Sequence, residues 1–167
     1  MNTGRYVVMG VAGSGKTTIG AKLAHALGVE FIDGDDLHPP QNVQRMAAGI
    51  PLTDEDREPW LLAIAARLRA AKRARRGLVV ACSALKRRYR DLLRSQGAAD
   101  TRFVHLAGER PLLAERLSIR RGHYMPAGLL DSQLAALEQP EPDEQAWVCD
   151  IRETPDAIVA DLLARST

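Results

Sequence analysis

Short apolar runs alternate along the chain with longer segments in which apolar residues recur every three or four positions. A short apolar run predicts a buried strand, and the longer periodic spacing predicts an amphipathic helix. The expected strands are 6–9, 29–32, 78–82, 103–106 and 146–151, and the expected helices lie near 16–27, 60–71, 86–94, 110–118, 129–138 and 155–165. This alternation predicts an α/β fold in which a five-stranded parallel sheet carries helices on both faces.

Two segments fit neither pattern, namely 33–59 and 120–127, and both are rich in polar, charged, Gly or Pro residues. We therefore expect irregular loops there. In parallel sheets, the loops after the carboxyl ends of strands are where ligands usually bind. The sequence thus indicates a candidate site at these segments, within one domain that spans 1–167.

The first expected strand leads into the octapeptide Gly-Val-Ala-Gly-Ser-Gly-Lys-Thr at positions 10–17. It fits the pattern G-x-x-x-x-G-K-[ST] at every fixed position, which indicates a loop that binds the phosphates of a nucleotide triphosphate such as ATP. The alternative is a glycine turn that only joins a strand to a helix. Glycines let backbone N–H groups reach phosphate oxygens, while Lys16 would contact the β- and γ-phosphates and Thr17 would bind Mg²⁺. The expected nucleotide contacts are Gly10, Ala12, Gly13, Ser14, Gly15, Lys16, Thr17 and Thr18.

Composition and charge argue against several classes of protein. Lys and Arg number 23 against 21 Asp and Glu, so the net charge of +2 gives the molecule no strong attraction to nucleic acid, and only 4% of residues are aromatic. The basic run 72–76 follows an apolar helical stripe and precedes Gly77, which suits the carboxyl end of a helix. No long apolar segment suits a membrane span, and the first residues do not resemble a signal peptide, so we expect a soluble cytoplasmic protein.

Three carboxylates follow the second expected strand, at Asp33, Asp35 and Asp36. If this strand lies near the first, the carboxylates face the phosphate loop. A kinase that phosphorylates an alcohol needs one carboxylate to accept or orient the hydroxyl proton and another to hold the water shell of Mg²⁺, and we assign these roles to Asp35 and Asp33. No acidic residue ends the third strand, so this loop must supply the carboxylate that assists Thr17. For Asp36 we favour a local role as the cap of a following helix.

Two cations stand apart from the phosphate loop. Arg57 lies in an acid-rich stretch that is expected to begin a helix, and its guanidinium is suited to clamping an anionic substrate. Lys86 follows the third expected strand and is either an anion-binding group or a solvated residue at a helix start.

Further arginines lie at the second irregular segment. Arg120 and Arg121 stand beside Gly122, which predicts a short Arg-rich lid at about 119–128 that neutralises phosphate charge and excludes water as the site closes. Arg116, nearer the preceding helix, is expected to stack on adenine. The alternative for any one of these arginines is a surface salt bridge.

With these features and several further blocks, the chain resembles the gluconokinase family, small P-loop kinases related in fold to shikimate kinase and the nucleoside monophosphate kinases. Arg45 and Tyr124 depart from the lysine and phenylalanine that are common in the family, and neither touches the expected chemistry. The blocks run over most of residues 6–160 and include Asp35–Pro39, Asn42–Met46, Gly49–Asp54, Asp56–Leu61, Ala81–Lys86, Arg121–Pro126 and Leu129–Gln133.

The resemblance implies transfer of the γ-phosphoryl group of ATP to the 6-hydroxyl of D-gluconate, with Mg²⁺, and it suggests a homodimer. Lys16, Arg120 and Arg121 would stabilise charge on the transferring group. A kinase for another small acceptor such as shikimate, and a nucleotide-dependent switch, remain the alternatives. His38 either contacts gluconate or only fixes its loop by a hydrogen bond. The expected gluconate contacts are Asp35, His38, Arg57, Lys86 and His123.

Overall fold

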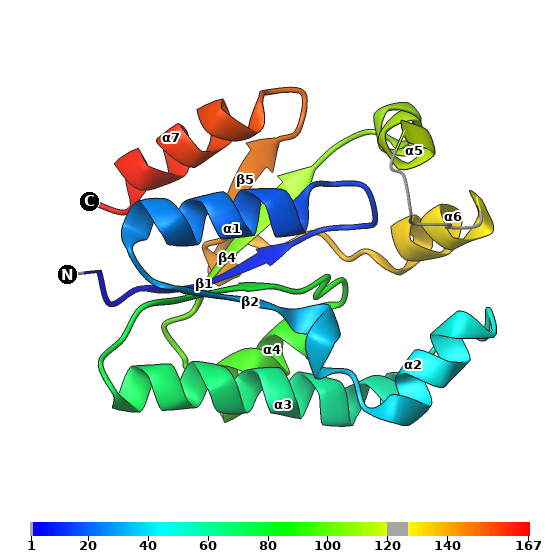
Figure 1. Cartoon of the computed structure of the whole chain (residues 1–167), viewed down its shortest axis with the longest axis horizontal. Helices are drawn as coiled ribbons and strands as arrows, with labels where there is room; N and C mark the ends of the chain where they lie inside the picture. The colour runs from blue at the N-terminus through cyan, green and yellow to red at the C-terminus, as the bar shows by residue number, and fades with distance from the viewer. Residues whose placement is uncertain (1, 120–126) are drawn as a thin grey trace.

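The strands in the middle of the sheet consist mainly of buried apolar residues, as the interior of a covered parallel sheet requires, whereas the edge strands are only partly buried. The strands are β1 (Arg5–Met9), β2 (Glu30–Asp33), β3 (Leu78–Ala81), β4 (Arg102–Ala107) and β5 (Trp147–Asp150). The computed structural model describes residues 2–119 and 127–167. Its sheet has the order β2-β3-β1-β4-β5, and every neighbouring pair is parallel (Figure 1), which confirms the fold predicted from the sequence.

Helices cover both faces of this sheet. On one face lie α1 (Lys16–Leu27) and α7 (Pro155–Arg165), and on the other lie α3 (Asp54–Arg73) and α4 (Arg87–Gln96) (Figure 1). Each face has its own buried apolar cluster, the first including Leu23 and Leu162 and the second including Ile64 and Leu93. Burying one such side chain stabilises the fold by about 1.5–3 kcal/mol, so these clusters hold the sheet between its helices. None of the helices described has the length and apolar character of a membrane span.

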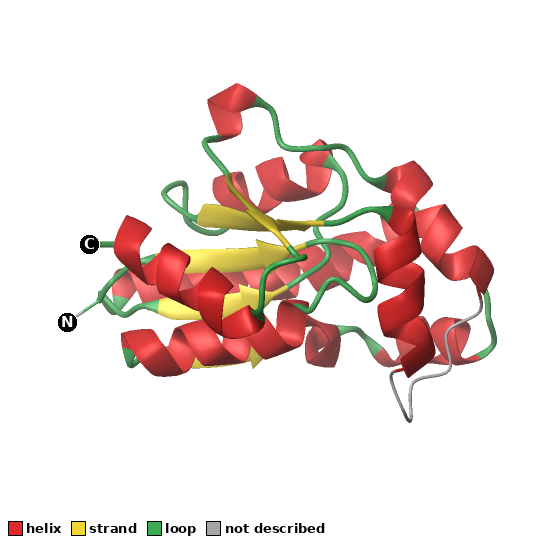
Figure 2. Ribbon diagram, turned by 90° about the horizontal axis from the view of Figure 1, so that it is seen from above, coloured by secondary structure: helices red, strands yellow, loops and turns green. Residues whose placement is uncertain are grey.

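The remaining helices lie mostly beyond the carboxyl ends of the strands (Figures 1 and 2). The phosphate loop 10–17 starts at this edge too, because it follows β1 directly. This edge therefore collects the segments in which the sequence predicted a site. The helices are η1 (Gly34–Leu37), α2 (Pro40–Ala47), α5 (Arg110–Ile119) and α6 (Ala127–Ala136), while η2 (Pro142–Glu144) precedes β5.

The prediction of an irregular loop over 33–59 was wrong. This segment contains η1, α2 and the beginning of α3. The start of α3 at Asp54 confirms the helix start expected in the acid-rich stretch around Arg57, although apolar periodicity alone indicated a helix only from about residue 60. In α2 the usual pattern is inverted, since Asn42 is buried while Val43 and Met46 are exposed. In α3 the apolar stripe begins only after an acidic first turn, which a capping box between Thr53 and Asp56 opens. Apolar periodicity therefore gave no signal for either start.

The condition set for the carboxylates after the second strand is met even though β3 lies between β1 and β2. Parallel pairing nevertheless brings the carboxyl ends of all three strands to one edge. The acid loop after β2 consequently still reaches the phosphate loop after β1, across the end of β3.

A fully buried ion pair fixes the segments on either side of α4. Arg90 donates through Nε to Glu144 Oε1 at 2.7 Å and through Nη2 to Glu144 Oε2 at 3.1 Å. It also donates to the backbone carbonyls of Ala84, Leu85 and Glu138 at 2.9, 3.2 and 2.9 Å. Burial by itself raises the pKa of Glu144, but hydrogen bonds from Arg90 and Arg94 lower that pKa to about 2. The pair thus ties the loop after β3 to the segment before β5.

Replacing Arg90 by Met should lower the free energy of unfolding by roughly 3–5 kcal/mol, because Glu144 then stays buried without its main partner. Urea denaturation at pH 7 measures this change. Arg67→Met is the matched control, since Arg67 is an exposed arginine whose ion pair with Glu30 spans 3.4 Å, and it should cost less than about 1 kcal/mol. Equal losses in the two variants would contradict the role given to the buried pair.

Candidate functional site

The phosphate loop leaves the first turn of α1 open toward solvent. Gly13 and Gly15 have φ values of 83° and 94°, a left-handed conformation that favours glycine, and Gly15 is the N-cap of α1. The first turn of α1 holds no acidic residue. Lys16 lies over the loop, with Nζ 3.1 Å from the carbonyl oxygen of Val11. A positively polarised helix end beside a lysine is a favourable place for phosphate groups.

The loop is held from outside by the two helices that flank residues 120–126. Gln133 of α6 accepts a hydrogen bond from the N–H of Ala12 at 2.6 Å. Leu117 of α5 packs against Gly13 so closely that a Cβ there would lie 2.9 Å from Leu117 Cγ. The N–H of Ala12, expected to face phosphate, is therefore directed to Gln133 instead. Reasoning from residue types missed Gln133, although the family block that ends at Gln133 could have drawn attention to it.

Ser14 differs from the other expected nucleotide contacts in its burial. Its side chain is fully buried, and its Oγ has no hydrogen-bond partner among the residues described. A side chain so buried packs against the protein interior and does not face a bound phosphate. Its backbone N–H donates to the carbonyl oxygen of Val11 at 3.2 Å, so the expected contact of Ser14 with phosphate stays a prediction.

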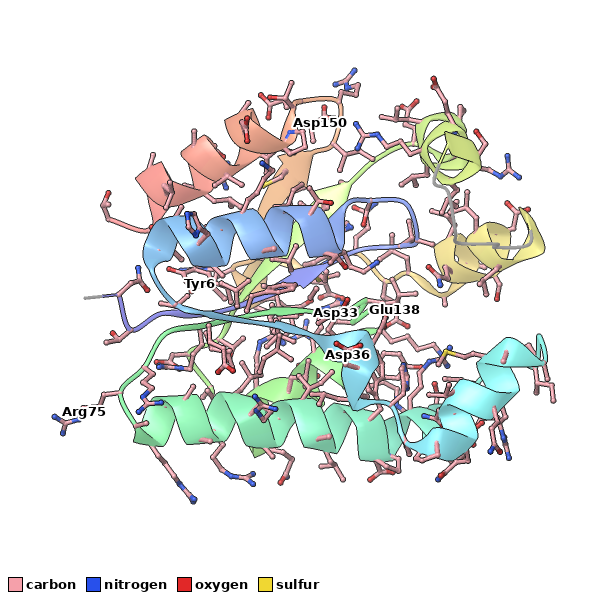
Figure 3. The ribbon with its side chains drawn as sticks, viewed as in Figure 1. Tyr6, Asp33, Asp36, Arg75, Glu138 and Asp150 are labelled. Atoms are coloured by element: carbon pink, nitrogen blue, oxygen red, sulfur yellow. The ribbon has the colours of Figure 1, made fainter. Side chains whose placement is uncertain are left out.

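The two residues predicted to hold Mg²⁺ lie together. Thr17 donates through Oγ1 to Asp33 Oδ2 at 3.5 Å, and Asp33 Oδ1 accepts the N–H of Asp35 at 3.0 Å. Figure 3 shows Asp33 at the carboxyl edge of the sheet, with Asp36 in the helical turn that follows it. A hydroxyl and a carboxylate, completed by water and phosphate oxygens, are the donors that Mg²⁺ prefers. Asp36 was expected to cap the next helix, but Pro39 is the N-cap of α2, so that expectation was wrong.

Trp60 holds the segment 33–36, called here the acid loop, by a hydrogen bond from the core. Its indole is buried, and Nε1 donates to the carbonyl oxygen of Gly34 at 2.7 Å. The ring of His38 stacks on the indole, with centroids 4.2 Å apart and an interplanar angle of 14°. Burial, and then the nearby charge of Arg57, lower the pKa of His38 to about 4. The histidine is therefore neutral near pH 7.

The two predicted substrate cations both lie beside the ring of Tyr89. The guanidinium carbon of Arg57 and the Nζ of Lys86 are each 5.8 Å from the centre of the Tyr89 ring. Arg57 also donates to the carbonyl oxygen of Leu52 at 2.7 Å, which fixes its direction. The structure thus brings together two cations that the sequence separates by 29 positions, from 57 to 86.

The carboxylate of Asp54 is the shared partner of Tyr89, Lys86 and Arg88. The Tyr89 hydroxyl donates to Asp54 Oδ1, Lys86 Nζ lies 3.2 Å from the same oxygen, and Arg88 lies 3.0 Å from Oδ2. Hydrogen bonds from Tyr89 and then Lys86 lower the pKa of Asp54. Sequence reasoning treated Asp54 as part of a helix start and gave Tyr89 no role, because their pairing depends on how α3 and α4 meet.

The predicted lid lies largely outside the described residues, and with it the expected contacts at Arg120, Arg121 and His123. Arg116, at the last turn of α5, donates to the carbonyl oxygen of Ile151 just after β5. Its guanidinium therefore joins two segments at the carboxyl edge of the sheet. Stacking of Arg116 on adenine stays a prediction.

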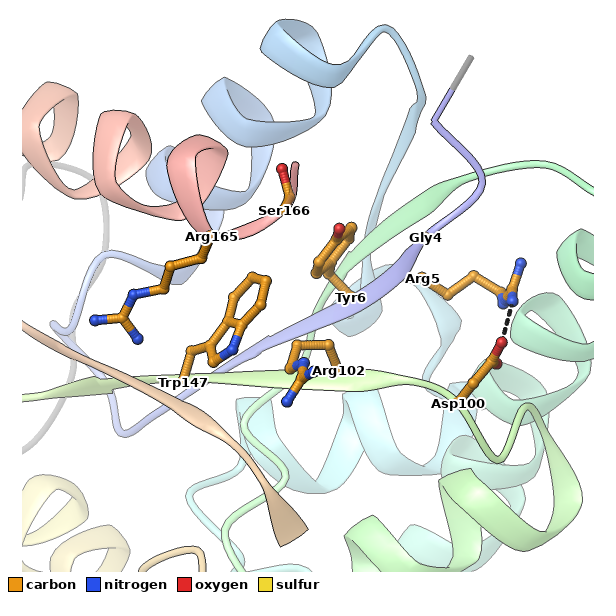
Figure 4. A pocket seen from close by; sticks show the side chains of 8 residues that line it. All are labelled: Gly4, Arg5, Tyr6, Asp100, Arg102, Trp147, Arg165 and Ser166. Atoms are coloured by element: carbon orange, nitrogen blue, oxygen red, sulfur yellow. Dashed lines mark hydrogen bonds and ion pairs between the residues drawn. The ribbon is translucent and has the colours of Figure 1, made fainter.

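A hollow of about 240 Å³ at the amino ends of the strands provides a contrast (Figure 4). Its cations already have partners: Arg5 lies 2.7 Å from Asp100, and Arg102 lies over the Trp147 ring at 4.7 Å. Ligands of parallel α/β folds bind at the opposite, carboxyl end of the strands. The candidate site is therefore the edge that carries the phosphate loop and the acid loop.

Comparison with known proteins agrees with this geometry. A family model described as shikimate kinase matches residues 12–164. A gluconokinase of Gluconobacter oxydans strain 621H is 48% identical over 157 residues, which cover 94% of this chain and 88% of the relative.

Solved structures lead to the same group of proteins. An unliganded sugar kinase from Janibacter sp. HTCC2649 superposes with a TM-score of 0.91 at 48% identity, covering 98% of this chain and 94% of that one. A gluconokinase from Sinorhizobium meliloti 1021 superposes with a TM-score of 0.89, also at 48% identity, covering 98% of this chain and 91% of that one. With the phosphate loop, the acid loop and the sheet order already in place, this chain belongs to the gluconokinase family of P-loop kinases.

Proposed function

We propose that the protein is a gluconokinase, which transfers the γ-phosphoryl group of ATP to the 6-hydroxyl of D-gluconate and releases 6-phospho-D-gluconate and ADP. The observation that carries this proposal is the contact between Thr17 and Asp33, which sets the acid loop against the phosphate loop. The residues proposed to bind the nucleotide and those proposed to bind the acceptor then lie at the same edge of the sheet. The named relatives, which are gluconokinases, support the choice of acceptor.

The nucleotide half consists of the α1 amino end, Lys16 and the pair Thr17 and Asp33. The backbone N–H groups after Gly15 and the Lys16 ammonium attract the phosphate chain. Thr17 and Asp33 would hold Mg²⁺, which neutralises charge on the β- and γ-phosphates when bound. Arg120 and Arg121 are proposed to add positive charge from the lid.

The acceptor half centres on Asp35. As the 6-hydroxyl oxygen bonds to the γ-phosphorus, the bond to the ADP oxygen breaks, and the hydroxyl proton passes to the Asp35 carboxylate. Asp35 follows Asp33 by two positions, and the Asp33 carboxylate holds its backbone N–H. The metal-binding carboxylate thereby also positions the proton acceptor.

The cations around Tyr89 suit a monoanionic sugar acid. Lys86 and Arg88 pair with the carboxylate of Asp54, and Arg57 lies beside the Tyr89 ring whose hydroxyl donates to that carboxylate. We assign Arg57 and Lys86 to the gluconate carboxylate, with His38 and His123 contacting its hydroxyl groups. Shikimate, an anionic acceptor of another shape, is the comparison that the matching family model suggests.

The acceptor assignment predicts that ADP release with ATP and Mg²⁺ depends on D-gluconate. Rates with shikimate, or without an acceptor, should stay close to background, and mass spectrometry should identify 6-phosphogluconate. Turnover with shikimate alone would retain the kinase and reject the gluconate assignment. Equal ADP release without acceptor would indicate a nucleotide hydrolase or switch.

Asp35→Asn should lower kcat by roughly 10²–10⁴-fold, because the hydroxyl proton loses its acceptor. The KM for ATP should change less than about twofold. Asp36→Asn removes the same charge one position away and should leave kcat near that of the wild type. Near-normal turnover of Asp35→Asn would remove Asp35 from the catalytic role.

Gln133→Leu should raise the KM for ATP about fivefold, because losing the hydrogen bond to the Ala12 N–H costs about 1 kcal/mol of loop order. Steady-state kinetics with varied ATP and saturating gluconate measures the effect. Ser132→Ala, an exposed neighbour on α6, is the control and should leave the KM unchanged. A wild-type KM for ATP in Gln133→Leu would show that the tether does not influence nucleotide binding.

A further inference from the structure

Asn42 is a buried amide that joins three segments of the acceptor half. It lies on α2, is 1% exposed, and donates through Nδ2 to the carbonyl oxygen of Asp56 on α3 at 2.8 Å. The same Nδ2 lies 3.2 Å from Nδ1 of His38. A carbonyl oxygen can only accept a hydrogen bond, so the amide atom beside Asp56 must be the nitrogen. The orientation of the Asn42 amide is thereby fixed.

This orientation determines where His38 carries its proton. Because an N–H of Asn42 faces Nδ1, that ring nitrogen must act as an acceptor, and the neutral ring then carries its hydrogen on Nε2. A doubly protonated ring would set two donors against each other. The lowered pKa of His38, caused by burial and by Arg57, agrees with a neutral ring. The carboxylate of Asp56 is turned toward Arg45, at 2.8 Å, rather than toward His38.

The plane of the His38 ring is fixed as well. The ring stacks on the Trp60 indole, which also holds the carbonyl of Gly34 next to Asp35. Within the ranges that the structure describes, Nε2 of His38 has no protein partner, and it does not belong to the side-chain atoms that are both buried and unpaired. The Nε2–H group therefore faces accessible space, with Asp35 three positions before it in the chain.

The oxygen of the Asn42 amide differs from its nitrogen. Its Oδ1 is buried and has no hydrogen-bond partner in the described part of the chain. A buried unpaired acceptor is unfavourable, and in folded proteins such an atom calls for an explanation beyond packing. Because only the NH₂ group of Asn42 is hydrogen-bonded, we infer that the role of this side chain is to direct that NH₂ group toward its two acceptors.

We propose that Asn42 is a positioning residue that fixes His38 as the Nε2–H tautomer, so that His38 offers an uncharged N–H donor to a hydroxyl oxygen of the acceptor. This inference rests on the proposed function, since it assumes a polyhydroxylated acid as acceptor. Arg57 and Lys86 attract the carboxylate, whereas a neutral donor recognises a hydroxyl without competing for that charge. A fixed Nε2–H group also makes a directional hydrogen bond, whereas the attraction of a charged group depends little on direction.

The tautomer is measured directly by ¹⁵N NMR of the histidine rings in the wild-type protein between pH 6 and 8. His38→Phe, which keeps a ring on Trp60, assigns the His38 signals by difference. We expect the shift of an unprotonated Nδ1 and a protonated Nε2. A protonated Nδ1, or equal populations of the two tautomers, would overturn the proposal whatever the acceptor proves to be.

Asn42→Asp tests the consequence, because it keeps the shape of the side chain and replaces the donor by an acceptor. The ring should change to the Nδ1–H or doubly protonated form, and the KM for gluconate should rise at least about tenfold while the KM for ATP changes less than twofold. Gln44→Glu adds the same charge at an exposed position of α2 and controls for it. A wild-type KM for gluconate in Asn42→Asp, despite an altered tautomer, would overturn the role of the donor.

His38→Phe keeps the proposal testable if Asn42→Asp does not fold, because it removes the donor and leaves Asn42 in place. Its KM for gluconate should rise by a similar factor, with thermal unfolding showing that the protein is folded. An unchanged KM would reject His38 as a contact. If the wild type phosphorylates a different acceptor, the same comparison is made with that acceptor, so failure of the gluconate assignment stays distinct from failure of this inference.

Discussion

Trp60 makes the contact on which the acceptor half depends. Its ring is buried among the apolar residues beneath the sheet, and its one polar atom holds the carbonyl of Gly34. A buried indole N–H needs a partner, and here that partner belongs to the acid loop rather than to the core. The position of the carboxylates after β2 is therefore coupled to the packing of α3. Stacking of His38 on the outer side of the same ring extends this coupling to α2.

In the nucleotide half, backbone conformation and contacts from two helices fix the phosphate loop. The loop after β1 is shaped by glycine conformations and then held by side chains of α5 and α6, at Leu117 and Gln133. In the sequence, these two helices come directly before and after the segment in which the lid is expected, and a displacement of α6 would alter the hydrogen bond to the N–H of Ala12. Nucleotide binding and the position of the lid helices are thereby linked through one hydrogen bond and one close apolar contact.

Local patterns were sufficient to predict the sheet, most helices and the phosphate loop, because each of these is encoded within a short stretch of chain. The start of α3 was indicated by its cap residues and acidic first turn, whereas α2 was not predictable from local patterns, since it buries Asn42 and exposes Val43 and Met46. The pairing of Thr17 with Asp33 followed from strand topology, because parallel strands end at one edge of the sheet even where β3 lies between β1 and β2. Gln133, Tyr89 and Asn42 were missed because their roles depend on contacts between distant elements. For Gln133 that contact spans 121 positions.

The place of β1 in the middle of the sheet affects how the protein reaches its native state. In the parallel register, Arg5 pairs with Leu78, and Tyr6 pairs with Arg102, so β1 is synthesised long before either of its partner strands. Such distant pairing slows folding, because long loops must close before the contacts that stabilise them exist. The loop that continues from β1 contacts the chain at both neighbouring strands, since Gly10 donates to the carbonyl oxygen of Ser83 at 3.3 Å and a Cβ on Gly10 would lie 3.0 Å from the carbonyl oxygen of Leu106. Because these contacts shape the phosphate loop, we expect nucleotide binding to require the paired strands. A chain that has formed only its helices should therefore not bind the nucleotide.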